Sequence, residues 1–385
     1  MTVEQNTERL KYLLKLFKIS AVELLSIINE NLKQPHTEAE IFAENIKLST
    51  LKKIDKVFDK GLSYYLDPST PKPTLESSIF FRKQNFSSEL NLEAKKIVNH
   101  FEAQKIALSA TAKLAEVDMK RKLLEYSVNH NAKEVALDVR SLLNPKFNKE
   151  PRQYLEILIG TLAAQNVLVF EFVETHNKKE RANIDGFFLK PNVIVLKRQQ
   201  QNLKREIFTL AHELGHALLN EEEIETLEEN FNSDAKLPRI ERWCNDFAFY
   251  FLLGSYESAF NKIENLSASN NYHQSLLIEI SEKTHLSRTA ILTRLSFDKK
   301  IGYPFYQRLV GEVNEEAINK RVEEKKKREL DKLNGKKAMG LPPKPINSPL
   351  FVSTLQLAYN QGIISEYELI KQLNIHPKNI SRYIE

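Results

Sequence analysis

The stretch that decides the fold reads Phe208-Thr-Leu-Ala-His-Glu-Leu-Gly-His-Ala-Leu-Leu219, past the middle of a chain of 385 residues. Four residues of an α-helix turn through about 400°, so His212 and His216 point the same way, one turn apart. Two imidazole nitrogens placed in this way can bind one zinc ion. Glu213 is rotated by about 100° from His212, toward the open coordination position of such a metal. The spacing therefore predicts two zinc ligands with a carboxylate beside them.

Glu213, between the two histidines, indicates which reaction the predicted zinc ion would support. Zinc lowers the pKa of a bound water to about 7, and a neighbouring carboxylate can then remove its proton at neutral pH. His-Glu-x-x-His on a helix therefore predicts a zinc peptidase with Glu213 as the catalytic base. The competing interpretation, two ordinary histidines on a helix, is disfavoured by the mostly apolar sequence around them. Gly215 is expected to leave room for a sheet or a substrate.

The third ligand has to come from downstream. Cys244 is the only cysteine of the chain, which excludes a thiolate-rich zinc site. Glu241 opens a second predicted helix, Glu241–Leu253, and Asn245 follows one turn later on the same face. This pair predicts a zinc ligand and an amide that orients the ligands; the alternative is that Glu241 only stabilises the positive end of the helix dipole. The other candidate ligands are acidic residues between the two helices: Glu221, Glu222, Glu223, Glu225, Glu228, Glu229 and Asp234.

Three strands are predicted before the first motif helix. Val167–Val173 is rich in β-branched and aromatic residues, and 184–189 and 192–196 read as a hairpin split by Lys190-Pro191. An extended substrate is expected to add to this hairpin as a further strand beside the zinc. The residues predicted to bind the substrate are Asp185, Gly186, Val193 and Val195.

The whole chain reads as an α+β protein that is mostly helical. Four regions are predicted, beginning with a small helical domain over residues 1–66. Residues 67–143 follow as a Pro-rich linker, Asp67–Pro73, and a helical connector. The metallopeptidase domain, with its small sheet, takes 144–300. Residues 301–385 contain a charged helix, a second linker and a last helical module.

Composition sets limits on the class of protein. Hydrophobic residues at 42% and charged residues at 28% are ordinary for a soluble globular protein, and the net charge of +5 is mild for this length. One cysteine excludes an internal disulfide framework and fits a reducing compartment. Lys15, Lys18 and Glu23 interrupt the apolar stretch near the N-terminus, so neither a signal peptide nor a membrane span is predicted. We therefore expect a cytoplasmic protein without membrane contacts.

The two motif helices and the strand pair before them together resemble the ImmA/IrrE family of metallopeptidases over about residues 150–300. The resemblance implies that His212, His216 and Glu241 bind zinc and that Glu213 is the general base. It also implies a substrate class: a helix-turn-helix repressor or antitoxin, whose cleavage derepresses genes of a mobile element, a stress response or phage defence. The chain departs from the family pattern at Asn220, often a histidine there, and at Gly254, where Met-Pro often follows the second helix.

The N-terminal sixty residues resemble the XRE-type helix-turn-helix that is often fused to this peptidase. Their expected recognition helix, Thr37–Glu44, carries three glutamates, which would repel a phosphate backbone. Docking of a partner is therefore the favoured role, and DNA binding the alternative. Two rival functions follow for the whole chain. One is a metal-binding regulator or toxin–antitoxin component that docks a partner without cleaving it, and the other is a transcription factor that uses residues 1–66.

Overall fold

The computed structural model describes residues 1–71, 90–174, 181–198, 203–222, 238–269, 273–333 and 345–384. They form two compact units: the N-terminal unit, Met1–Gln104 with Lys179–Ile184, and the main unit, Lys105–Lys178 with Asp185–Glu385. The predicted boundaries at 66 and 143 differ from this division. Residues of the predicted connector belong to both units, since Leu92 packs against the N-terminal core and Val135 lies in the core of the main unit.

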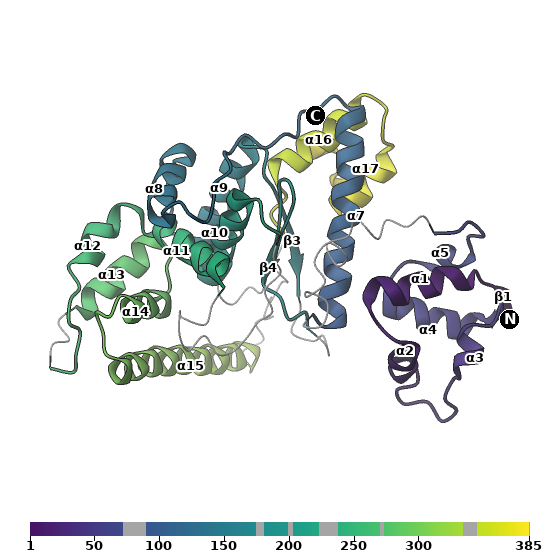
Figure 1. The fold of residues 1–385 in the computed structure, drawn as a ribbon, viewed down its shortest axis with the longest axis horizontal. Coiled ribbons are helices and arrows are strands. Elements are labelled where there is room, and N and C mark those ends of the chain that lie inside the picture. Colours follow the sequence, from purple (N-terminus) through teal and green to yellow (C-terminus); the bar gives the residue numbers. More distant parts are fainter. Residues whose placement is uncertain are drawn as a thin grey trace. The chain divides into compact units, whose positions relative to one another are not determined.

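The N-terminal unit is a small helical bundle with a two-stranded antiparallel sheet (Figure 1). Val3 of the first strand pairs with Ile46 of the second. Side chains of Ser20 and Asn6 cap two of the helices, and the buried core centres on Leu10, Phe17 and Leu51. The elements are β1 (Thr2–Glu4), α1 (Thr7–Phe17), α2 (Ala21–Ile28), α3 (Glu38–Ile41), β2 (Asn45–Lys47), α4 (Leu48–Phe58) and α5 (Leu62–Leu66).

The segment expected to be a recognition helix is a single helical turn. Thr37 caps α3, which ends at Ile41, and Asn45–Lys47 is strand β2. Ile41 is buried in the core, so the turn contributes to the packing of this unit. The prediction of a recognition helix over Thr37–Glu44 is therefore wrong, because the helix ends at Ile41 and strand β2 begins at Asn45, directly after the segment.

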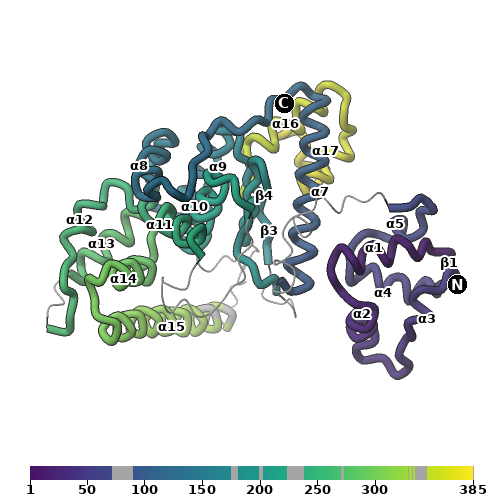
Figure 2. The backbone as a smooth tube through the Cα atoms, viewed as in Figure 1, coloured from purple at the N-terminus to yellow at the C-terminus, as the bar shows by residue number. Residues whose placement is uncertain are grey.

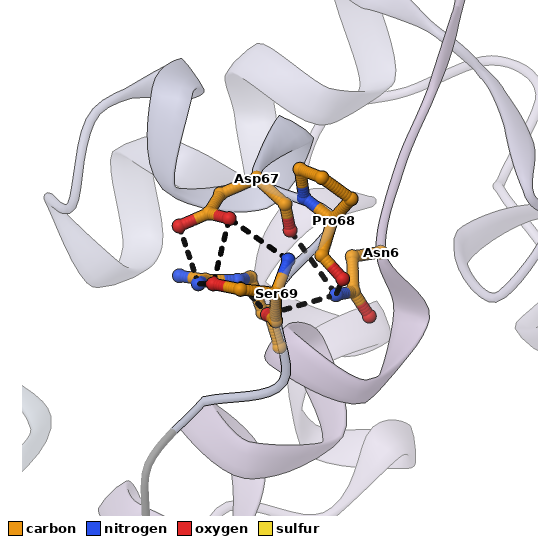
Figure 3. Close-up of polar contacts among 5 residues, drawn as sticks. Asn6, Asp67, Pro68 and Ser69 are labelled. Atoms are coloured by element: carbon orange, nitrogen blue, oxygen red, sulfur yellow. Dashed lines mark hydrogen bonds and ion pairs between the residues drawn. The ribbon is translucent and has the colours of Figure 1, made fainter.

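The first residues of the predicted linker fold back onto α1. Figure 3 shows the amide of Asn6 reaching the backbone carbonyls of Asp67, Pro68 and Ser69, at 3.1–3.2 Å. Arg9 pairs with the Asp67 carboxylate at 2.5 Å and donates to the Ser69 carbonyl at 3.0 Å. The part of Asp67–Pro73 up to Ser69 thus belongs to the N-terminal unit, and Lys72 and Pro73 lie outside the described residues.

A long helix, α7 (Leu92–Leu114), follows, and the main unit then builds helices around a three-stranded sheet (Figures 1 and 2). The strand order is β3-β5-β4, with β5 parallel to β3 and antiparallel to β4. Helices α9 and α10 pack against this sheet, and α11 packs between α10 and α8. The elements up to the second motif helix are α8 (Ala132–Leu143), α9 (Pro151–Ala164), β3 (Leu168–Val173), β4 (Gly186–Leu189), β5 (Val193–Arg198), α10 (Leu203–Leu219) and α11 (Arg239–Leu253).

Helix α8 belongs to the main core. Its residues Val135, Ala136 and Val139 are buried in the same hydrophobic cluster as α10 and α11, although the sequence predicts a connector here. Arg140 of α8 donates a hydrogen bond to the Phe251 carbonyl and lies against Gly254, the C-cap of α11 at φ 52°. A Cβ at Gly254 would meet the Arg140 guanidinium at 2.4 Å, so the glycine is needed both for the turn and for this basic cap.

The remaining helices complete the main unit. Most of α15 beyond Gly311 is exposed, as expected for the densely charged stretch 315–333. Phe351 of the C-terminal module packs edge-on against Phe170 of β3 at 5.3 Å between ring centroids. The elements are η3 (Gly254–Tyr256), α12 (Glu257–Asn261), α13 (Gln274–Thr284), α14 (Arg288–Phe297), α15 (Tyr303–Leu333), α16 (Pro349–Asn360), α17 (Glu366–Leu373), η4 (Pro377–Asn379) and α18 (Ser381–Ile384).

Two general expectations can be compared with this architecture. The predicted class, a mostly helical α+β protein with a small sheet within residues 144–300, is confirmed. Among the helices of the described residues, none combines the length and apolar character that crossing a bilayer requires.

Candidate metal centre

Helix α10 carries the motif through the interior of the main unit. Its seventeen residues include a buried run from Leu210 to Leu219, and the apolar members of that run lie in the main core. His212, Glu213 and His216 are themselves only 5%, 4% and 1% exposed. Buried ionisable groups are costly unless they are paired or coordinate a metal, so this placement indicates a dedicated polar site.

Three of the predicted ligands converge. His212 Nε2 lies 3.3 Å from Glu241 Oε2, and His216 Nε2 lies 3.3 Å from Glu241 Oε1. The two Nε2 atoms are 3.1 Å apart, and a ligand atom from each of the three residues lies within 4.8 Å of the others. Two imidazoles and a carboxylate at this spacing could hold a metal ion, so the residues fit the zinc that the sequence implies.

Asn245 contacts one of the two imidazoles. Its Oδ1 lies 3.0 Å from Nδ1 of His212. A carbonyl oxygen only accepts hydrogen bonds, so Nδ1 carries the hydrogen and the lone pair of Nε2 points into the site. This is the arrangement expected for Asn245 one turn after Glu241 on α11.

Gly215 sets the distance between the two motif helices. A Cβ at this position would lie 3.1 Å from Sγ of Cys244 and 3.2 Å from its Cα. The sequence suggested that Gly215 makes room for a sheet or a substrate, but the space is taken by helix α11. Because Cys244 lies three residues after Glu241, this close contact holds the carboxylate helix against the histidine helix.

Glu213 points to a different neighbour, strand β4. A Cβ at Gly186 would lie 3.2 Å from Cγ of Glu213 and 2.8 Å from Cγ2 of Thr209, one turn earlier on α10. The candidate base thus lies directly against the first residue of the strand. Neither Thr209 nor Cys244 is recognisable from sequence, since both acquire their role from contacts between distant segments.

The residues predicted to bind substrate are divided by the sheet topology. Val193 and Val195 lie on β5, the central strand, where Leu168 and Phe170 of β3 pair on one side and β4 on the other. They cannot receive a further strand, so the prediction for these two residues is corrected. Asp185 has its carboxylate paired with Arg205 and its carbonyl bound by the Lys197 N–H. Gly186 lies on β4, an edge strand of the described sheet.

The acidic residues after α10 have other roles where they are described. Glu222 is 3% exposed and accepts a hydrogen bond from the Lys190 N–H at 2.8 Å, and half-exposed Glu221 lies 3.9 Å from the Lys190 ammonium. Neither belongs to the three-residue ligand group. The other candidates, Glu223, Glu225, Glu228, Glu229 and Asp234, lie outside the described residues.

Charged contacts fix both ends of α10. At its start, Glu206 pairs with Arg198 at 2.6 Å, and Arg198 also pairs with Glu171 of β3 at 2.6 Å. Burial raises the pKa of the Glu171 carboxyl, while the Arg198 charge opposes that rise. At its end, Arg121 donates to the Ala217 carbonyl, next to His216. A cation at the C-terminus of a helix interacts favourably with its dipole, so both ends of the motif helix are held.

Comparison with known proteins bears on this region. The family model described as the IrrE N-terminal-like domain, peptidase family M78, matches residues 163–296, which contain β3, β4, β5 and both motif helices. This part of the chain is therefore similar to a metallopeptidase domain of the ImmA/IrrE family. Searches of curated proteins and of solved structures find no match.

Proposed function

We propose that the main unit is a zinc-dependent endopeptidase in which His212, His216 and Glu241 hold the metal and Glu213 is the general base. The observation that carries the proposal is the buried convergence of two imidazoles and one carboxylate, with a second carboxylate between the histidines in sequence. The family match over the same residues supports it. A purely structural zinc site is disfavoured because such sites are closed by four protein ligands, and the only cysteine, Cys244, packs against Gly215.

Each residue then has a defined task. Zinc, when bound, supplies Lewis acidity that lowers the pKa of a water and polarises a peptide carbonyl. Glu213 accepts the proton of the attacking water and returns it to the leaving amine. Asn245 keeps the hydrogen of His212 on Nδ1, so that Nε2 remains a ligand. The low exposure of the four ionisable groups keeps bulk water away from the proton transfer.

The substrate is an extended segment of a protein that pairs with β4. Gly186 begins this edge strand directly beside Glu213, so a segment added to β4 would bring its backbone close to the base. The resemblance to ImmA/IrrE peptidases supports the class of substrate, a helix-turn-helix repressor or antitoxin. Its cleavage would derepress genes of a mobile element, a stress response or phage defence.

Comparing cells that contain the wild type with cells that contain Glu213→Gln tests the proposal. We expect new protein N-termini, detected by terminal labelling and mass spectrometry, in wild-type cells alone. A regulator that binds metal and docks a partner without cleaving it would keep its effect on gene expression in the Glu213→Gln variant. The same N-termini in both strains, or regulation that survives the substitution, would contradict the peptidase proposal.

Nucleic-acid binding by the N-terminal unit is a second candidate, and one observation favours it. The outward face of α4 carries Lys52, Lys53 and Lys56 at helical spacing, opposite the buried Leu51 and Ile54. This helix, and not acidic α3, is the element suited to phosphates. Residues 1–71 contain ten basic and ten acidic residues, so the attraction would come from this one face and not from net charge.

A gel shift with the full chain and a 30-base-pair duplex tests this candidate. Each lysine that contacts a phosphate contributes about 0.9 to the slope of log K against log salt. Lys52→Glu/Lys56→Glu should therefore lower the slope by about two, whereas Lys11→Glu, on α1 and paired with Glu8, should leave it unchanged. Equal slopes for both variants would exclude α4 as the contact.

A further inference from the structure

Gly186 of strand β4 lies next to the candidate base, Glu213. A methyl group at this position would be 2.8 Å from Cγ2 of Thr209, 3.1 Å from the Val195 carbonyl oxygen and 3.2 Å from Cγ of Glu213. Contacts below about 3.4 Å between heavy atoms of these kinds are repulsive, so at least one neighbour would have to move. Thr209 and Glu213 are one turn apart on α10 and therefore share the face that meets β4.

The requirement for glycine here is one of space and not of backbone conformation. The described glycines with positive φ are Gly61, Gly254 and Gly362, and Gly186 is not among them. Its strand conformation is open to any amino acid. A side chain at Gly186 would therefore act only through the atoms that it displaces.

The displacement would fall on the base. The Val195 carbonyl belongs to β5, whose backbone pairs with strands on both sides, so it cannot yield easily. The remaining neighbours are the side chains of Thr209 and Glu213, or else β4 itself must lift away from α10. A shift of Thr209 alone would still leave the contact with Cγ of Glu213 at 3.2 Å, and a shift of Glu213 or of β4 alters the distance between the strand and the carboxylate.

From this contact we propose that Gly186 is a positioning residue for Glu213: its missing side chain allows β4 to lie against α10 and fixes where the carboxylate stands beside the strand. The inference rests on the proposed function, since it concerns the base of that reaction. The contact concerns the base and not the candidate metal ligands. The three atoms nearest to a Cβ at Gly186 belong to Thr209, Val195 and Glu213, and none belongs to His212, His216 or Glu241.

The experiment uses the full chain loaded with Co²⁺, whose absorption spectrum reports the ligand set, and acetohydroxamate as the probe. A hydroxamate chelates a metal with open positions and shares its proton with a neighbouring carboxylate, so its affinity reports on Glu213. Four variants are compared with the wild type: Gly186→Ala, Gly186→Ala/Thr209→Ser, Glu213→Gln and Gly160→Ala. Gly160 on α9 has open space around it, so its alanine variant is the matched control.

We expect all variants to bind Co²⁺ with wild-type affinity and spectrum. Gly186→Ala should lower the affinity for acetohydroxamate by about tenfold. Misplacing a reacting group by 1 Å can cost about a hundredfold, and we expect a displacement well under 1 Å here, so the loss should be smaller. Thr209→Ser removes the closest clash and should restore most of the affinity in the double variant. Glu213→Gln should give the lowest affinity for acetohydroxamate, and Gly160→Ala should bind it as the wild type does.

Three results would overturn the inference. Wild-type acetohydroxamate affinity in Gly186→Ala, while Glu213→Gln weakens it, would show that the base is insensitive to this contact. Loss of Co²⁺ in Gly186→Ala would show that the glycine supports the ligands instead. Should Gly186→Ala not fold, Gly186→Ala/Thr209→Ala is compared with Thr209→Ala, and equal affinities there would also refute the inference. Failure of the wild type to bind Co²⁺ would instead contradict the proposed function.

Discussion

Helix α10 meets the rest of the candidate centre through two faces, and the two are built differently. One face carries His212, Gly215 and His216 and packs against helix α11. The other carries Thr209 and Glu213 and packs against strand β4. The first contact joins two helices of one core, while the second depends on the edge of a sheet. In the proposed reaction, metal binding and proton transfer would therefore depend on separate contacts, and each should be removable without the other.

Removing the base should give the largest difference between the two faces, because peptide hydrolysis should be lost while zinc binding is kept. Glu213→Gln keeps the size of the side chain and leaves the α11 face untouched. Zinc content should therefore stay at the wild-type level, whereas peptide hydrolysis should fall by about 10²–10⁴-fold, the usual contribution of a general base. The measurement is zinc content by elemental analysis together with cleavage of the protein found by N-terminal labelling. Loss of zinc in this variant would show that the two faces are not independent.

Removing the orienting amide tests the ligand face alone. Asn245→Ala leaves Nδ1 of His212 without its acceptor at 3.0 Å, so the imidazole is no longer held in one tautomer and orientation. Loss of such a partner typically costs 10–100-fold in metal affinity, and we expect a change of about that size. Competition with a zinc chelator measures it, and Asn261→Ala, on α12, is the control. An unchanged affinity would mean that Asn245 does not orient the ligand.

Crowding the contact between the motif helices should have a smaller effect. In Gly215→Ala the new methyl would lie 3.1–3.2 Å from Cys244, so α11 must move by a few tenths of an ångström. Zinc affinity should fall by about tenfold through displaced Glu241, with destabilisation of about 1–3 kcal/mol from overpacking. Cys244→Ala removes the Sγ contact and should recover part of the affinity. If Gly215→Ala bound zinc with wild-type affinity, the contact between Gly215 and Cys244 would not be needed to position Glu241.

The smallest expected effect lies outside both faces, at His285. Its ring stacks on Phe147 at 5.1 Å, and Nε2 donates to the Asn148 carbonyl at 2.7 Å. Burial lowers the pKa of His285 below its ordinary value of 6.5. The unfolded chain therefore binds a proton more readily, so this contribution to stability is complete above about pH 6.5 and is lost as the pH falls through the lowered folded pKa.

Urea unfolding of the metal-free protein between pH 5 and 8 checks this prediction. Stability should decrease toward pH 5 in the wild type, and less steeply in His285→Gln. Parallel pH profiles would contradict the assignment. Acid sensitivity that appears only with zinc bound would instead belong to the metal centre, since protons compete with the metal for its histidine ligands.

The convergence of His212, His216 and Glu241 can be predicted from the sequence because it follows from helical spacing. His212 and His216 are four residues apart, as are Glu241 and Asn245, and a helix turns such pairs toward the same side. Burial of both helices follows from their apolar residues, and the three predicted ligands converge in the structure. The convergence therefore agrees with the spacing.

The other features depend on register between distant segments, which local spacing does not contain. Val193 and Val195 read like any half-buried strand, and only the order β3-β5-β4 places them in the centre of the sheet. Gly186 and Thr209 become neighbours through packing of a strand on a helix. Likewise, Thr37–Glu44 has a helical pattern, but the helix ends at Ile41 and the chain enters strand β2, paired with β1, at Asn45.

The most direct test of the central claim is zinc content by elemental analysis on the wild type and on His212→Ala, Glu241→Ala and Glu241→Gln, with Glu222→Gln as a control for a buried carboxylate outside the ligand group. The account predicts about one zinc per chain in the wild type and in Glu222→Gln, no zinc in His212→Ala, and weakened binding in both Glu241 variants. A well-folded wild type without bound metal would contradict the account and favour a protein that acts by docking alone.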